Sequence, residues 1–135
     1  MDAVSPHGPS PVVSAMVLCD LAITEQGTNK KTLVGIFQRV NAQVFPVPQR
    51  MFLYMQMTDA QGTYIFRIEV VDIDRDNILG TVTSNPIEVP NRLEPFDFVF
   101  PIGMIIPAAG LYEFRLYANE AYLSSISFTA QGANP

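Results

Sequence analysis

Residues 110–129, GLYEFRLYANEAYLSSISFT, carry the clearest periodicity of the chain and decide its fold. In the first half, charged Glu113 and Arg115 alternate with apolar side chains. The apolar positions are Tyr112, Phe114, Leu116 and Ala118. After a polar pair the alternation resumes, and we expect one face to carry Tyr122, Ile126 and Phe128. Successive side chains of a β-strand point to opposite faces, so this stretch predicts a hairpin with one apolar face.

A lone hairpin is marginally stable in water, so the rest of the chain must supply a second apolar layer. Strand-like segments are expected at 12–25, 32–40, 51–58, 63–72, 78–83, 87–89 and 96–102. No segment shows the i, i+3, i+4, i+7 spacing of an amphipathic helix over a useful length. The sequence therefore predicts an all-β fold, an antiparallel two-sheet β-sandwich of about eight strands, immunoglobulin-like or jelly-roll-like in form.

Three regions are expected along the 135 residues. Several prolines and few apolar residues favour an extended arm at residues 1–11, ahead of a single sandwich domain at residues 12–130 and a tail at residues 131–135. Val4 and Pro6 of the arm are candidate contacts with a neighbouring subunit. Packing of the arm on its own surface is the alternative interpretation.

The composition indicates a globular protein and disfavours some kinds of binding partner. Apolar residues make up 48% of the chain, which is ample for a core, and the net charge of -5 disfavours binding to nucleic acid or to anionic membranes. The N-terminus lacks the features of a signal peptide, and no run approaches the roughly 18 apolar residues of a spanning helix. Cys19 is the only cysteine, so no intramolecular disulfide is expected. These features predict a cytoplasmic protein.

Two hairpins of the sequence resemble a known family. The first carries an LCD start, a Gly-containing turn and an LxGIFxR return, at residues 18–20 and 33–39. The closing hairpin, with Gly110, Tyr112 and Phe114, is also similar. The family consists of small uncharacterised bacterial β-sandwich proteins, a domain of unknown function. The resemblance implies a β-sandwich and implies no catalytic residue.

Asp72, Asp74 and Asp76 place carboxylates at alternate positions of the segment DIDRDN. This spacing resembles the opening of an EF-hand loop, because Ca²⁺ takes about six to eight oxygen ligands from a tightly turning backbone. However, Asn77 stands where that loop requires Gly, and Thr83 where it requires a bidentate Glu. We interpret the segment as a solvated polar turn. The alternative is a Ca²⁺-dependent ligand-binding module that uses these three aspartates.

The sequence contains no recognisable catalytic constellation. His7 is the only histidine and lies in the arm, away from the packed nucleophile that a catalytic triad requires. Cys19 alternates with apolar neighbours, which predicts a small buried side chain and not a reactive thiol. We therefore predict no catalytic residue, no enzymatic activity and no cofactor apart from the Ca²⁺ alternative.

The remaining candidates are residues for association. Tyr117 lies opposite the apolar row of its strand and is expected to be exposed. Met104, Ile105 and Ile106 form an apolar stretch that is too long for a plain loop, and such patches mark association surfaces when they are exposed. For Tyr117 the alternatives are a sugar- or peptide-binding face and packing in the core. For the other three residues the alternative is that they cap one end of the sandwich core. The predicted function is a non-enzymatic interaction or structural module, which self-associates or docks to a protein partner through a sheet face and the N-terminal arm.

Overall fold

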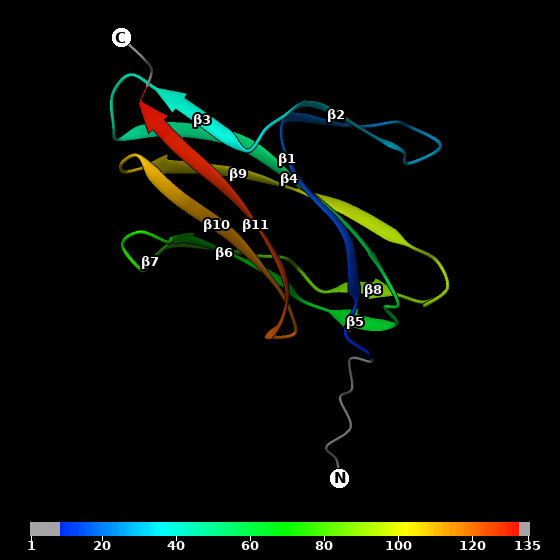
Figure 1. Cartoon of the computed structure of the whole chain (residues 1–135). Coiled ribbons are helices and arrows are strands. Elements are labelled where there is room, and N and C mark those ends of the chain that lie inside the picture. The colour runs from blue at the N-terminus through cyan, green and yellow to red at the C-terminus, as the bar shows by residue number, and fades with distance from the viewer. Residues whose placement is uncertain (1–8, 133–135) are drawn as a thin grey trace.

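The computed structural model describes residues 9–132, and within this range the fold is all-β (Figure 1). The eleven strands are β1 (Val12–Thr24), β2 (Lys31–Ile36), β3 (Arg39–Ala42), β4 (Val47–Thr58), β5 (Gly62–Tyr64), β6 (Phe66–Asp72), β7 (Asn77–Thr83), β8 (Ile87–Val89), β9 (Phe96–Ile106), β10 (Gly110–Ala118) and β11 (Ala121–Gly132). None of the described residues belongs to a helix that could cross a membrane. The predicted fold class is confirmed, although the predicted number of strands is too low.

The strands form two large sheets and one small one. The four-stranded sheet has the order β2-β1-β4-β9, and the five-stranded sheet has the order β3-β11-β10-β6-β7. A short ladder of β5 and β8 lies beside them. Two stacked sheets of this kind bury one face of each strand and leave the other face toward solvent.

The core forms where the inward rows of the two sheets meet. Alternate residues of β4 supply one side, with Met51, Leu53, Met55 and Met57 each at most 1% exposed. The predicted rows of β6 and β10 supply the other side. These rows are Phe66, Ile68, Val70, Tyr112, Phe114, Leu116 and Ala118, and all of them are buried. The period-two pattern of the sequence therefore identified the core-facing residues of the central strands.

The expected strand at 32–40 is divided because the chain passes from one sheet to the other. The Phe37 amide donates to the Leu18 carbonyl in β1, and the Thr129 amide donates to the Gln38 carbonyl, both at 3.0 Å. After this crossing, β3 pairs with β11 in parallel. The expectation of a purely antiparallel sandwich is therefore wrong at one edge.

The segment at 63–72 is divided at Ile65. Its amide donates to the side chain of Asn119, 2.9 Å away, and its carbonyl accepts from the Asn119 amide at 3.0 Å. These bonds take the place of continuous ladder pairing, so β5 leaves the sheet and pairs with β8. Together the two divisions raise the strand number above the expected eight.

The predicted face of Tyr122 in the closing hairpin is wrong, because β11 contains a bulge. The register shifts next to Tyr117, so that Leu116 is opposite Ser124 and Tyr117 is opposite Tyr122. Tyr122 therefore shares the outer face with Tyr117 and is 56% exposed, whereas Phe128 lies in the core. One extra residue in a strand reverses the direction of the side chains that precede it, which simple alternation could not predict.

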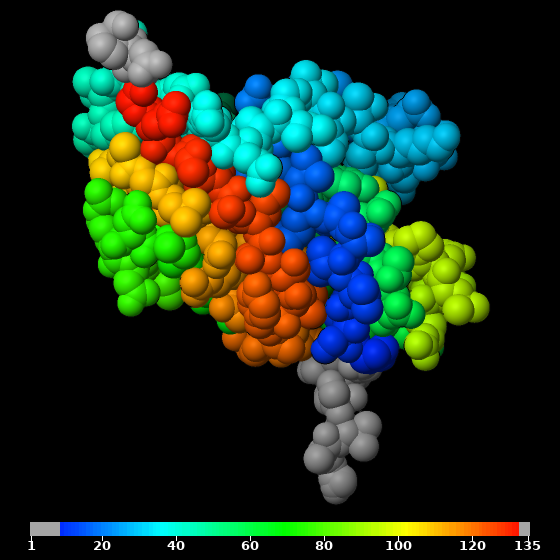
Figure 2. All heavy atoms as spheres, viewed as in Figure 1, coloured from blue at the N-terminus to red at the C-terminus, as the bar shows by residue number. Residues whose placement is uncertain are grey.

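The β1–β2 hairpin extends beyond the two layers, as Figure 2 shows for the blue and cyan segment at one side of the molecule. One face of this hairpin carries exposed aliphatic side chains, namely Leu21, Ile23, Val34 and Ile36. The other face approaches β9, where Lys31 Nζ lies 2.9 Å from Asp97 Oδ1. The hairpin is thus attached to the sandwich at its far end as well as at its base.

Candidate functional site

The sandwich is open at the edge formed by β7 and β9. The Phe98 ring of β9 lies 4.8 Å from the Phe66 ring of β6, centroid to centroid, which places β9 over β6. The next strand of the five-stranded sheet is β7, whereas β9 is the last strand of the four-stranded sheet. Among the described strands, β7 therefore has no strand of the other sheet opposite it.

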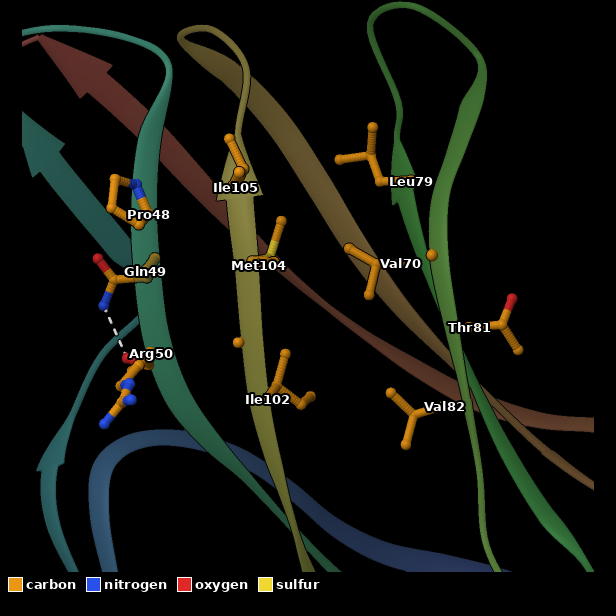
Figure 3. A pocket seen from close by; sticks show the side chains of 12 residues that line it. Pro48, Gln49, Arg50, Val70, Leu79, Thr81, Val82, Ile102, Met104 and Ile105 are labelled. Atoms are coloured by element: carbon orange, nitrogen blue, oxygen red, sulfur yellow. Dashed lines mark hydrogen bonds between the residues drawn. The ribbon is translucent and has the colours of Figure 1, made fainter.

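A groove of about 860 Å³ lies at this edge and continues around β9 onto the outer face of its sheet (Figure 3). Val70, Leu79 and Val82 line it from the five-stranded sheet. Ile102, Met104 and Ile105 line it from β9. The groove is also lined by Pro48, Gln49, Arg50, Gly80, Gly103 and Thr81. Its surface is mainly aliphatic, and Arg50 is the only charged residue of the described range 9–132 that lines it.

Two glycines keep the groove open. Gly80 is opposite Val70 in the β6–β7 ladder, so a side chain at this position would point inward. Gly103 is opposite Arg50 in the β4–β9 ladder and lies on the outer face. A Cβ atom added at either glycine would meet no atom within 4 Å. The backbone of both edge strands is therefore uncovered where it borders the groove.

This arrangement is suited to binding an extended segment. A strand at the edge of a sheet presents N–H and C=O groups that have no partner on one side. Apolar side chains beside such an edge can accept the alternate side chains of an added strand. The groove brings these two features together along β9.

The predicted association residues lie in different places. Met104 is partly exposed and Ile105 is 64% exposed, and both line the groove. Ile106, in contrast, is fully buried in the core, which agrees with the alternative interpretation of this stretch. Val4 and Pro6 lie outside the described residues, as does His7.

Tyr117 is on the outer face as predicted, but it is only partly exposed. The guanidinium carbon of Arg67 lies 4.0 Å from the centre of its ring, and its hydroxyl donates to Glu69 at 3.1 Å. Burial raises the pKa of the Tyr117 phenol, and the hydrogen bond to Glu69 adds to this increase. Arg67 also pairs with Glu69 and Glu120. These partners make Tyr117 part of a cross-strand network that stabilises the sheet.

The predicted solvated turn at DIDRDN is wrong for Asp72, which is fully buried at the end of β6. Its carboxylate accepts from the Arg75 amide at 3.2 Å and from the Arg75 guanidinium at 3.0 Å. Asp74 is exposed and accepts from the Leu111 amide at 3.1 Å, while exposed Asp76 adopts a positive φ of 49°. Within residues 9–132, no three His, Cys, Asp or Glu side chains are grouped so that they could hold a metal ion.

Cys19 is fully buried, as predicted. Its strand partner is Phe52 on the outer row of β4, because the neighbouring pair Leu18 and Leu53 occupies the core row. Burial raises the pKa of the Cys19 thiol. The thiolate, which is the nucleophilic form, is therefore disfavoured.

Sequence reasoning missed Arg50, Gly80 and Gly103. A glycine inside a strand is a signal for close approach by another backbone, and both glycines carry that signal. Their position at free edges depends on which strands lack a neighbour, and that property emerges only from long-range pairing.

Comparison with known proteins gives one family. A model described as "Family of unknown function (DUF6941)" matches residues 14–131, which is most of the chain. No curated protein matches the sequence. The match agrees with the resemblance to a domain of unknown function that the two hairpins indicated.

Proposed function

The chain belongs to DUF6941, a family of unknown function, and we propose that it is a non-enzymatic β-sandwich module that accepts an extended segment of a protein partner at its open edge. The segment lies along β9 and covers the inward side chains of β7. The observation that carries this proposal is the aliphatic groove at this edge, where β9 is the last strand of its sheet and lies over β6, with β7 as the next strand of the other sheet.

An added strand would gain stability in two ways. Its backbone would pair with the free edge of β9, which extends the four-stranded sheet by one strand. Its inward side chains would cover the aliphatic surface of Leu79, Val82 and Met104. Complete burial of one large aliphatic side chain contributes about 1.5–3 kcal/mol, so a few such contacts offset the cost of ordering a short segment.

The partner in this proposal is another protein or a second copy of the chain, in the cytoplasm. Residues 1–11 are a proposed additional contact. The exposed aliphatic face of the β1–β2 hairpin is a further apolar surface that association would cover.

A groove-filling variant tests the proposal. Gly80→Val places a β-branched side chain in the groove at a strand position where an added Cβ meets no atom within 4 Å. Thr83→Val is the matched control, because Thr83 is exposed on the same strand and does not line the groove. A phage-displayed library of linear octapeptides is selected on the wild-type protein, and the enriched peptides are then measured on both variants.

We expect enriched peptides to bind the wild type and Thr83→Val equally, and to lose at least tenfold in affinity for Gly80→Val. Amide hydrogen exchange should slow in β9 when such a peptide binds. The proposal is wrong if no peptide is enriched, or if Gly80→Val binds as well as the wild type. Light scattering on the same variants, and on a chain that lacks residues 1–11, shows whether self-association uses the groove or the arm.

A further inference from the structure

We propose that the segment accepted at this edge carries a carboxylate opposite Gly103, where Arg50 binds it. This inference rests on the proposed function and specifies the chemistry of the partner as an acidic residue flanked by large aliphatic residues. It follows from the relative positions of Arg50, Gly103 and the free edge of β9.

Arg50 and Gly103 are opposite each other on β4 and β9, on the outer face of the four-stranded sheet. The next pair along the ladder, Met51 and Ile102, is buried on the inner face. Since Gly103 has no side chain, nothing on β9 separates Arg50 from a strand added at the edge, and a Cβ at Gly103 would meet no atom within 4 Å. The glycine thus leaves a gap that faces the incoming segment.

The distance across this gap suits a long ion pair. Neighbouring strands are about 4.8 Å apart, so a residue opposite Gly103 on the added strand lies roughly 10 Å from the Arg50 backbone. An arginine and an acidic side chain together span this separation. Ile105 is the other large side chain on this part of β9's outer face, and it would remain beside the pair.

The charge of Arg50 is free for such a contact. Five other basic residues pair with a carboxylate of the chain, namely Lys31, Arg67, Arg75, Arg92 and Arg115. Arg50 forms no ion pair with any residue of the described range 9–132, and its side chain is exposed. Among the residues that the structure describes, no acidic residue lines the groove. The electrostatic complement of this edge is therefore a negative charge.

The period of a β-strand then determines the neighbours of the acidic residue. If the carboxylate points to the outer face opposite Gly103, the residues before and after it point to the inner face. There they lie beside Ile102 and Met104 and over Val70 and Leu79, where the lining is aliphatic. The preferred segment has the pattern aliphatic, acidic, aliphatic in an extended conformation.

A charge exchange tests this inference. Two fluorescein-labelled octapeptides are derived from an enriched library member, and they differ only by Glu or Lys at the position predicted to lie opposite Gly103. Each is titrated against the wild type, Arg50→Glu and the control Arg39→Glu, which alters an exposed basic residue on β3. We expect the wild type and Arg39→Glu to prefer the Glu peptide by about threefold to tenfold, and Arg50→Glu to prefer the Lys peptide.

The preference should weaken at high ionic strength, because the pair lies near the surface. Equal affinity of the wild type for both peptides would overturn the inference while leaving the proposed function intact, provided that Gly80→Val still weakens binding at least tenfold. An unchanged preference in Arg50→Glu would overturn it as well. Failure of the library to enrich any peptide overturns the proposed function and this inference together.

Discussion

Lys31 Nζ lies 2.9 Å from Asp97 Oδ1 and attaches the β1–β2 hairpin to the start of β9. The two side chains are only 12% and 25% exposed, so the pair is more shielded than an ordinary surface ion pair. The second oxygen of Asp97 accepts from the Tyr54 hydroxyl at 2.9 Å. The far end of the hairpin is thus attached to the sandwich through a carboxylate that Lys31 and Tyr54 share.

Lys31→Ala should lower the free energy of unfolding by about 1 kcal/mol, because a partly buried carboxylate loses its counter-charge. The control is Lys30→Ala, which alters the exposed neighbour and should change stability by no more than a few tenths of a kcal/mol. Urea unfolding gives both values, and amide exchange of the hairpin should become faster in Lys31→Ala alone. Equal stabilities of the two variants would contradict this role for the pair.

The same carboxylate makes stability sensitive to alkaline pH. Burial raises the pKa of Tyr54 from 10.0 to about 12, and the hydrogen bond to Asp97 adds to the increase. The unfolded chain therefore releases the phenol proton at a lower pH than the folded chain does. The stabilisation is fully present below pH 10 and is lost as the pH rises to about 12.

Tyr54→Phe should remove this part of the alkaline loss. We expect the melting temperature of the wild type to fall more steeply between pH 10 and 12 than that of Tyr54→Phe. Tyr122→Phe, at an exposed tyrosine, should behave like the wild type. Parallel curves for the wild type and Tyr54→Phe would show that the phenol does not contribute.

Gly35 allows a close approach within the β1–β2 hairpin. Its φ is +69°, and the Asp20 carboxylate occupies the space where a Cβ would lie. Gly35→Ala should therefore lower the free energy of unfolding by about 1–2 kcal/mol or more, from backbone strain together with displacement of Asp20. Gly80→Ala is the control, since its φ lies outside the left-handed region and the added Cβ meets open space. Thermal unfolding of both variants measures the difference. A Gly35→Ala variant as stable as Gly80→Ala would contradict this role for the glycine.

The sequence predicts the core-facing residues of the central strands better than it predicts the pairing at the sheet edges. The alternating rows of β4, β6 and β10 were predictable because each row needs only a local pattern. Local patterns could not predict three other features, because each results from pairing with a distant segment or from a bulge. These features are the crossing at Phe37 and Gln38, the parallel β3 and the reversed face of Tyr122.

The candidate site shows the same division. The apolar excess at Met104 and Ile105 was visible in the sequence and proved to line the groove. The local sequence gives no sign that Arg50 and Gly103 belong to a site. They become candidates because they are opposite each other in the β4–β9 ladder, and β9 is the last strand of its sheet. A free edge is a property of the strand order, so a residue pattern within one strand cannot reveal it.

The Asp74 side chain separates the structural interpretation of the β6–β7 loop from the calcium hypothesis. Its Oδ2 accepts from the Leu111 amide and lies against Gly110, so it links this loop to the start of β10. Asp72 is already bonded to Arg75. We therefore expect millimolar Ca²⁺ to leave the melting temperature of the wild type unchanged.

Two substitutions at Asp74 complete this test. Asp74→Ala should lower the free energy of unfolding by about 1 kcal/mol with or without Ca²⁺, because the Leu111 amide loses its acceptor. Asp74→Asn keeps an acceptor oxygen and removes the charge, so it should lose less than half as much. A rise in the wild-type melting temperature with Ca²⁺, abolished by Asp74→Asn, would instead establish a metal site. The two variants thus distinguish an oxygen needed as an acceptor from one needed as a ligand.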